Sequence, residues 1–361
     1  MKSKGKNGNW KIVLILFGLS VIIKIFSFFP SFVEEWYSLQ IYPLISMALR
    51  WLTGWLPFSL GDVLYAMASI WILIRIYKTL KAVFKRRVTK QSFRNSLRKT
   101  LAIALWVYLL FNLFWGINYE RLGIAYQLKL EPVEYSTTAL KDLAGLLIQK
   151  TNSERLRLGE SYTYPSSKEI FREAKEAYDS AFIKYSFMRY AVPSVKSSLY
   201  GQLGNYLGFL GYYTPFSGEA QINTAIPTFL IPYTTCHEIG HQLGYGTEDE
   251  ANFSGYLAAK SSGEPSFRYS AYFDLFLYAN RELYFRDSVT ARENYKLLDT
   301  LVKKDIATYR KFLEAHQNPI EPYITELYGK YLQANNQPNG MNTYDEVIGW
   351  LIAYQKKYGE L

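Results

Sequence analysis

The chain has 361 residues, enough for one large domain or two ordinary ones; 49% are hydrophobic, 17% are aromatic and the formal net charge is +10. A basic chain of this kind interacts with nucleic acid or with a membrane surface, and the position of the charge distinguishes the two. The sequence has no zinc-finger spacing, helix-turn-helix signature or pair of aromatic RNA-binding strands, so we expect no nucleic-acid partner.

Most of the clustered basic residues lie next to apolar segments. The first cluster is Lys2, Lys4, Lys6 and Lys11, and the second, in a predicted loop over 75–99, is Arg75, Lys78, Lys81, Lys85, Arg86, Arg87, Lys90, Arg94, Arg98 and Lys99. This arrangement is typical of the charge that flanks transmembrane segments. The sequence therefore predicts a lipid bilayer as a partner.

Three segments approach the roughly 20 apolar residues that a membrane-spanning helix needs: 12–29, 60–77 and 101–117. Lys24 interrupts the first, but its long stem lets the ammonium group reach the interface. In the third, Trp106, Tyr108 and Trp115 resemble interfacial anchors. A cleavable signal peptide is the alternative for the first segment. No small-residue cleavage site follows it and two further apolar runs do, so we expect three transmembrane helices.

The positive-inside rule places the N-terminus and the 75–99 loop in the cytoplasm of a bacterial cell. Residues 1–117 then form a membrane anchor, and residues 118–361 form a domain outside the cytoplasmic (inner) membrane. Between the first two spans, residues 30–59 include an amphipathic stretch that is expected to lie on the membrane. Cys236 is the single cysteine of the chain, so no internal disulfide reports the compartment.

The outer domain is predicted to be mainly helical. Apolar residues recur at helical spacing over 140–150, 169–185, 272–286, 292–312 and 342–358, and turn-forming residues separate these segments. Residues 208–233 differ, because their Gly, Pro, Tyr and β-branched residues indicate loops and short strands. The predicted fold class is therefore mainly α: three transmembrane helices, then a mostly helical α+β domain with a small β element.

The segment after this β element reads HEIGH, from His237 to His241. On a helix, residues four apart share a face, so the two imidazoles can bind one metal ion. Glu238 lies beside them, where it can accept a proton from a water molecule during catalysis. The chain has three histidines in all and two fall in this motif, which favours a metal site over a helix with two buried structural histidines.

A catalytic zinc ion usually has three protein ligands, so the motif needs a third. Two glycines end the motif helix, and Thr247 can start a second helix with carboxylates near the turn. Glu250 fits a capping box with Thr247, so we favour Glu248 as the third ligand and keep Glu250 as the alternative. Asn252, one turn after Glu248, can support the site from the same face. Asp249 is expected to face solvent.

Two other residues with metal-binding side chains are expected to have structural roles. His316, far along the chain in FLEAHQNP, is predicted to meet the last carbonyl groups of a helix. Cys236, next to the motif, is predicted to be a small core residue.

The HEIGH segment and the EDEAN that follows resemble the gluzincin metallopeptidases, in which a glutamate beyond HExxH completes the zinc site and a polar residue one turn later supports a histidine. This resemblance implies a zincin-like domain, a bound Zn2+ and a supporting role for Asn252. The whole chain also resembles a bacterial family known as domain of unknown function 3810. That resemblance lies in the three apolar spans, in LPFSLGD at Leu56, in YYTPFSGEAQIN at Tyr212 and in the HEIGH segment.

Metallopeptidases of this type commonly bind substrate along an edge strand beside the motif helix. Residues 218–225 are the predicted edge strand, with Glu219 and Asn223 on one face. A group that stabilises the oxyanion is also needed. The candidates for that group are Tyr213, Tyr233, Tyr245 and Tyr328.

These features predict a membrane-anchored zinc metallopeptidase that cleaves a peptide or protein substrate outside the cytoplasmic membrane. Glu238 would deprotonate the attacking water and then protonate the leaving amine. One alternative is a non-catalytic envelope scaffold that contains zinc and binds peptides, but structural zinc does not need a general base such as Glu238. Another is a zinc amidase that acts on cell-wall peptide, since the pocket shape and not the ligand set selects the substrate.

Overall fold

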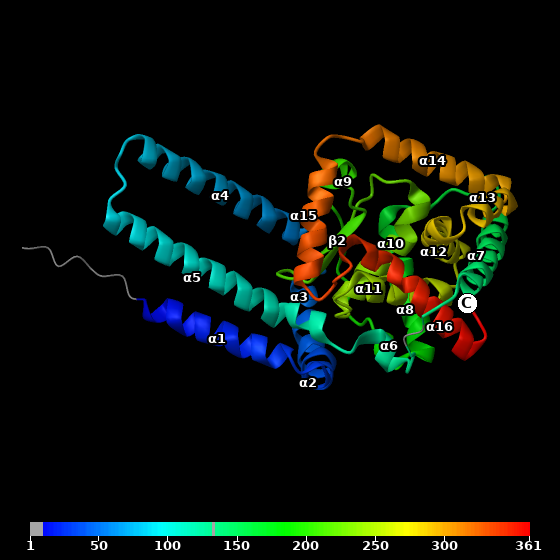
Figure 1. The fold of residues 1–361 in the computed structure, drawn as a ribbon, viewed down its shortest axis with the longest axis horizontal. Coiled ribbons are helices and arrows are strands. Elements are labelled where there is room, and N and C mark those ends of the chain that lie inside the picture. Colours follow the sequence, from blue (N-terminus) through cyan, green and yellow to red (C-terminus); the bar gives the residue numbers. More distant parts are fainter. Residues whose placement is uncertain (1–9, 132–133) are drawn as a thin grey trace, which may run out of the picture.

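Long apolar helices at the N-terminus extend away from a mainly helical domain (Figure 1). The computed structural model describes residues 10–131 and 134–361, and Lys2, Lys4 and Lys6 of the first basic cluster lie outside the described residues. The long helices are α1 (Lys11–Ser27), α4 (Leu60–Phe84) and α5 (Lys90–Phe114).

Two of these helices, α4 and α5, are each long and apolar enough to cross a membrane. The shorter α1 meets the same criterion only together with Pro30–Thr53, to which it is joined at an angle of 97°. Within the described residues the structure therefore supports two or three membrane spans, and three were predicted.

The helical hairpin of α4 and α5 extends further than predicted. α4 continues to Phe84, and α5 begins at Lys90 and not at residue 101. The predicted 75–99 loop is therefore mostly helix. Lys and Arg are good helix formers, and the side chains of Thr89 and Ser92 cap the start of α5 reciprocally. The tip of the hairpin and the start of α1 lie at the same end of the molecule (Figure 1).

The segment between α1 and α4 folds against the outer domain. It contains α2 (Pro30–Phe32), the π-helical η1 (Val33–Ile41) and α3 (Tyr42–Thr53). The buried residues of α3 recur about once per turn, and they are Tyr42, Ser46, Arg50 and Thr53. The opposite face leaves Leu44, Trp51 and Leu52 exposed, which is typical of a helix that lies at a membrane surface.

The outer domain is built around two buried helices, α10 and α11. In chain order its elements are η2 (Gly116–Glu120), α6 (Gly123–Gln127), α7 (Thr137–Leu158), α8 (Ser167–Lys184), η3 (Ser186–Met188), β1 (Val195–Ser197), α9 (Gly201–Leu207), β2 (Gly211–Thr214), β3 (Glu219–Ile222), η4 (Thr228–Leu230), α10 (Ile231–Gln242), α11 (Glu248–Ser261), α12 (Pro265–Arg286), α13 (Ser288–Leu297), α14 (Thr300–His316), α15 (Glu321–Ala334), η5 (Gly340–Glu346) and α16 (Val347–Tyr358). α8, α12 and α16 pack against α11, and α7 packs against α12 (Figure 1).

The helical segments predicted from the sequence largely coincide with helices of the structure. One of them, 292–312, is divided into α13 and α14. The division occurs because Leu298 and Asp299 have extended backbones, and the Asp299 carboxylate accepts a hydrogen bond from the N–H of Leu301 at the start of α14. The expected fold class, mainly helical with a small sheet, is confirmed.

Within the described residues, three short strands form one sheet in the order β1-β3-β2. β1 is parallel to β3, and β2 is antiparallel to it. The prediction of an edge strand over 218–225 is therefore wrong: β3, which contains Glu219, is paired on both sides, and β1 and β2 form the two edges. The error arose because an alternating sequence pattern gives the faces of a strand but not its place in the sheet.

One face of the sheet binds the first turn of α4. The Glu219 carboxylate accepts hydrogen bonds from the backbone N–H groups of Leu60 at 3.1 Å and Gly61 at 2.6 Å. The Tyr212 hydroxyl donates to Asp62 Oδ1 at 2.6 Å. A helix N-terminus has unsatisfied N–H groups and a partial positive charge, and the buried carboxylate satisfies both. The first turn of a candidate membrane helix is thus fixed to the sheet.

A buried ion pair joins η1 to the outer domain. Arg121 donates from Nε and Nη2 to the two carboxylate oxygens of Glu34 at 2.9 and 2.8 Å, and the side chains are 2% and 1% exposed. Gln127 Nε2 and the N–H of Gly123 donate to the same carboxylate. These hydrogen bonds compensate for removing the charge from water.

We expect Arg121→Met to destabilise the full-length protein by about 3–5 kcal/mol, because Glu34 would keep a buried charge without its partner. Thermal unfolding of the protein purified in detergent measures the effect. The matched control is Lys24→Met, since Lys24 pairs with Glu120 across side chains that are 54% and 25% exposed. That change should cost about 1 kcal/mol or less. Equal losses in the two variants would contradict a special role for the buried pair.

Candidate metal centre

The HEIGH helix α10 and the following α11 cross where both have glycine. A Cβ on Gly240 would lie 2.3 Å from the Ser254 hydroxyl, and a Cβ on Gly255 would lie 2.9 Å from the backbone N of His237. The absence of both Cβ atoms lets the helices approach closely. Gly244, with a φ of +88°, reverses the chain between them. As a result the first turn of α11 lies over the imidazoles of α10.

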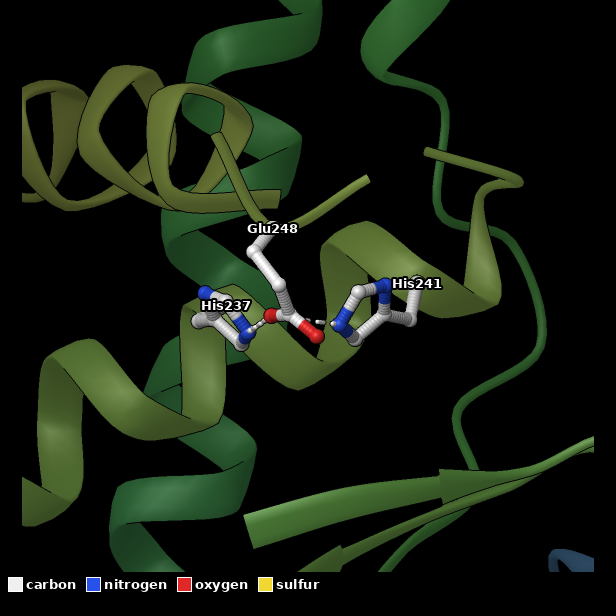
Figure 2. A group of neighbouring side chains, drawn as sticks. All are labelled: His237, His241 and Glu248. Carbon is white, nitrogen blue, oxygen red and sulfur yellow. Dashed lines mark ion pairs between the residues drawn. The ribbon is translucent and has the colours of Figure 1, made fainter. Parts of the chain in front are cut away.

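Three side chains point toward one another at this crossing (Figure 2). Glu248 Oε2 lies 3.2 Å from His237 Nε2 and 3.5 Å from His241 Nε2. All three residues are buried, with 5–8% of their surface exposed. Each residue offers one potential metal-ligand atom, and these three atoms lie within 4.8 Å of one another, so the group could hold a metal ion.

The protonation of both imidazoles is set by their other ring nitrogens. His237 Nδ1 lies 2.7 Å from the Asn252 side-chain oxygen, and His241 Nδ1 lies 2.8 Å from the backbone oxygen of Tyr245. An oxygen of either kind only accepts, so each Nδ1 carries the proton. An imidazole protonated at Nδ1 alone directs the lone pair of Nε2 toward Glu248, which is the arrangement that metal-bound histidines adopt.

The Glu248 oxygen in this group also fits a bound cation. Oε2 is buried with the two imidazole Nε2 atoms as its polar neighbours, whereas Oε1 accepts a hydrogen bond from the Tyr328 hydroxyl at 2.8 Å. Leaving a buried carboxylate oxygen unsatisfied is costly. When both imidazoles carry a proton on Nδ1 alone, two lone pairs and one carboxylate oxygen face a common point, and a metal ion at that point would satisfy all three.

Without a metal ion, these groups shift the pKa values of one another. Burial alone would raise the pKa of Glu248, but hydrogen bonds and charge from the two histidines hold that pKa well below its usual range. Burial alone would lower the pKa of His241, but the Glu248 carboxylate outweighs it and raises the pKa to about 9. The ionised carboxylate thus draws positive charge into the site, as a proton on His241 or as a metal ion.

Glu238 lies next to the group and has an oxygen that is not committed to another residue. Its Oε2 is buried without a hydrogen-bond partner, and burial raises the pKa of the carboxyl group to about 7. The backbone of Gly211 in β2 lies so close that a Cβ there would be 2.6 Å from Glu238 Oε1. The carboxyl group therefore lies between the motif helix and the edge strand.

The two other acidic residues of the EDE cluster face away from the metal centre. Glu250 does not form the predicted capping box, since the Thr247 side chain makes no capping hydrogen bond. Glu250 instead accepts a hydrogen bond from the N–H of Ile124 at the start of α6. Asp249 is not solvated as predicted: it is 8% exposed and accepts a hydrogen bond from the Trp350 indole. Both hydrogen bonds join segments that are distant in the sequence, so the pattern of neighbouring residues could not reveal them.

Among the four candidate tyrosines, only the hydroxyl of Tyr328 bonds to a residue of the metal group, through Glu248. The Tyr245 hydroxyl donates to Gln127, and the Tyr233 hydroxyl donates to the backbone oxygen of Asn252. The Tyr213 hydroxyl pairs with that of Tyr42 at 3.4 Å. Tyr245 reaches the site with its carbonyl group instead, through His241.

The remaining predicted residues lie inside the domain. Asn223 is buried and bonds to Asn205 and to the backbone oxygen of Phe209, and Glu219 binds the start of α4 as described above. His316 Nδ1 donates to the Phe312 carbonyl at 2.7 Å, which confirms its predicted place in the last turn of a helix. Cys236 is fully buried without a disulfide, as predicted.

Sequence analysis missed the residues that hold the C-terminal end of α10. The Tyr42 hydroxyl donates to the carbonyls of His241 and Gln242, and the Ser46 hydroxyl also donates to that of Gln242. The indole of Trp115 donates to the carbonyl of His241 at 3.1 Å. Trp115 was predicted to be an interfacial anchor, but it is 5% exposed and packs against the site. The sequence signal that could have revealed the role of α3 is the recurrence of polar residues at helical spacing along it.

The comparison with protein families agrees with the resemblance seen in the sequence. A family model described as "Protein of unknown function (DUF3810)" matches residues 37–352, which include both the candidate spans α4 and α5 and the metal centre. The chain belongs to this family. No significant match was found to a curated protein or to a solved structure.

We expect the purified family member to bind about one metal ion per chain, and Glu248→Gln to weaken that binding strongly. Removing Asn252 as Asn252→Ala should weaken it by about 10- to 100-fold, because the partner of a ligand is lost. Elemental analysis after dialysis measures the bound metal. The matched control is Glu250→Gln, which keeps the shape of a neighbouring carboxyl group and should retain the ion. Equal metal content in all four proteins would rule out a site at this position.

Proposed function

We propose that this protein is a membrane-anchored zinc metallopeptidase that hydrolyses peptide bonds outside the cytoplasmic membrane. The observation that carries the proposal is the convergence of His237 Nε2, His241 Nε2 and Glu248 Oε2 beside an uncommitted Glu238. Three ligand atoms and one adjacent carboxyl group are the parts that a catalytic metal site requires.

The spacing of the ligand atoms supports zinc. Zn2+ binds imidazole nitrogen and carboxylate oxygen at about 2.0–2.1 Å in a tetrahedron, which separates neighbouring ligand atoms by about 3.3 Å. The two histidine-to-Glu248 distances, 3.2 and 3.5 Å, bracket that value. Two histidines and one glutamate are also among the ligand sets of catalytic zinc, and such sites leave the fourth position for water or substrate.

The side chains of the site would divide the chemistry as follows. Bound zinc would polarise the scissile carbonyl group and lower the pKa of a water molecule. Glu238 would accept a proton on Oε2, the atom without a partner, and would return it to the leaving amine. Burial raises the pKa of this carboxyl group, which favours the uptake of a proton. Tyr328 would hold Glu248 by Oε1 and so keep Oε2 directed at the ion.

The edge strand β2 offers a binding site for an extended peptide. The N–H of Asn223 donates to the Leu210 carbonyl, so alternate residues from 210 onward bond to β3. The N–H and C=O groups of Gly211 and Tyr213 therefore point away from β3, along the free edge. Gly211 contacts Glu238, so a peptide added to this edge would pass beside the general base.

The same features bear on the alternative functions. A non-catalytic zinc scaffold would not need an uncommitted carboxyl group beside the metal, and a structural site usually has four protein ligands. A cell-wall amidase would use the same ligands. The free edge of β2 favours an extended peptide with a regular backbone, which is the form of a protein substrate.

We expect Glu238→Gln to retain the metal and the fold but to lose about 100- to 10,000-fold in the rate of peptide cleavage, because the amide cannot accept the proton. Peptide-library cleavage by the detergent-solubilised protein, with and without a chelator, measures the rate. Chelator-sensitive cleavage that persists undiminished in this variant would disprove the mechanism. Absence of cleavage in the metal-loaded wild type would favour the scaffold.

We further expect the metal centre to face the outside of the cell. The basic tip of the α4–α5 hairpin lies at the opposite end of the molecule from the outer domain, and basic segments stay in the cytoplasm (Figure 1). Reporter fusions at Arg87 and at Leu361 test this. A cytoplasmic signal at Leu361 would place the site in the wrong compartment for the proposed function.

A further inference from the structure

We propose that the basic end of the α4–α5 hairpin, residues 75–99, is a binding surface for the phosphate groups of anionic lipids. These lipids belong to the leaflet on the side of the membrane away from the outer domain. The inference does not depend on the peptidase function. It follows from the charge, exposure and helix length at the far end of the two candidate spans.

The hairpin end is strongly basic and contains no acidic residue. Between Asp62, in the first turn of α4, and Glu120, in η2, the sequence has neither Asp nor Glu. The hairpin end also lies far from the outer domain (Figure 1). All of its basic residues except the half-buried Arg98 are exposed, and they are Arg75, Lys78, Lys81, Lys85, Arg86, Arg87, Lys90, Arg94, Arg98 and Lys99. An anion from outside the chain is the electrostatic complement of this surface.

Helix length places these charges at the headgroup layer. From Leu60, where α4 begins, to Lys78 the helix rises about 27 Å, close to the roughly 30 Å of the hydrocarbon core. Arg75 lies about one turn inside that boundary, so its long side chain can reach the interface. α4 then continues to Phe84 for about 9 Å, and the headgroup layer on one side is about 5–8 Å thick. The end of the hairpin therefore lies among the headgroups and just beyond them.

Exposed apolar side chains are interspersed with the basic ones at this end. Phe84 is 85% exposed and Phe93 is 61% exposed, and Val83 and Val88 are about half exposed. At a bilayer these side chains enter the interface, while the neighbouring ammonium and guanidinium groups bind phosphates. A nucleic-acid duplex presents phosphates without an apolar layer. The mixed surface therefore favours lipid over nucleic acid.

Lipid also has access to every face of α4 next to these charges. The five consecutive residues 70–74 are all exposed, and at about 100° per residue they cover the full circumference of the helix. From residue 70 to residue 77 the helix has no Gly, Ala, Ser or Thr, which transmembrane helices use for close packing. This part of α4 is therefore suited to contact with lipid and not with a second helix.

The test measures which lipids bind the full-length protein. The protein is reconstituted in equal amounts of anionic phosphatidylglycerol and of phosphatidylethanolamine, extracted with mild detergent and examined by native mass spectrometry. We expect phosphatidylglycerol to be enriched at least about tenfold among the retained lipids, because each basic residue near a membrane surface contributes about a factor of five. The enrichment should fall in about 1 M NaCl, which screens charges at a surface.

Two sets of substitutions test whether the hairpin end is the binding surface. Replacing four of its residues by glutamine should lower the enrichment at least about fivefold, and these residues are Lys81, Lys85, Arg87 and Lys90. The matched control makes the same change of net charge at exposed residues of the outer domain, which are Lys168, Lys296, Arg310 and Lys311. The control should retain the enrichment of the wild type.

Three outcomes would overturn the proposal. The first is equal retention of the two lipids by the wild type. The second is an equal loss of enrichment in the hairpin and control variants. The third is binding of a DNA duplex, in a neutral detergent, that is lost in the hairpin variant while the wild type shows no lipid preference.

A second measurement locates the hairpin end relative to the membrane. The Phe84→Cys variant is labelled with a fluorescent dye, since the native Cys236 is fully buried. We expect phosphatidylglycerol with brominated acyl chains to quench this dye more strongly than brominated phosphatidylethanolamine. The control is Phe285→Cys, at an outer-domain phenylalanine that is 83% exposed, and its dye should not be quenched. Absence of quenching at Phe84→Cys, or equal quenching by the two lipids, would overturn the proposed contact.

Discussion

The structure depends on three lone pairs that meet in a buried space. Two imidazole nitrogens and one carboxylate oxygen repel one another there unless positive charge lies between them. The surrounding residues maintain this arrangement: Asn252 and the Tyr245 carbonyl fix the protons of the imidazoles, and Tyr328 occupies the other oxygen of Glu248. The glycine contacts between α10 and α11 bring the ligands together. The helix crossing, the hydrogen bonds and the burial are consistent with one requirement, the binding of a cation.

The N-terminal elements α3 and α5 complete this centre with their side chains. A helix leaves its last carbonyl groups without internal donors, and in α10 these groups belong to the segment that holds the metal ligands. Tyr42 and Ser46 of α3 and Trp115 at the end of α5 supply the donors. The buried pair of Glu34 and Arg121 adds a second connection. An outer domain expressed without residues before 118 would therefore lose the side chains that hold one end of the ligand helix.

Local sequence was sufficient for features that depend on near neighbours. The spacing of His237 and His241 predicted a helix with both imidazoles on one face. Glu248, at the start of the following helix, was the favoured third ligand, and the structure brings these three residues together. Predictions that depended on distant contacts failed. Glu250 and Asp249 bind Ile124 and Trp350, and β3 acquires a neighbour on each side. A one-dimensional pattern contains no information about which distant segment supplies a partner, and the roles of Tyr42 and Trp115 were missed for the same reason.

The carboxylate of Glu219 mechanically links α4, a candidate membrane span, to the sheet. It holds the first turn of α4, and its strand neighbours β2, whose edge lies beside Glu238. A membrane helix responds to bilayer thickness by tilting, at a cost of a fraction of a kcal/mol per Å of mismatch. Because the first turn of α4 is bonded to β3, a tilt of α4 in a bilayer would pull on the strands. If α4 crosses the membrane as proposed, acyl-chain length would thereby act on the sheet beside Glu238 without any lipid bound to the site.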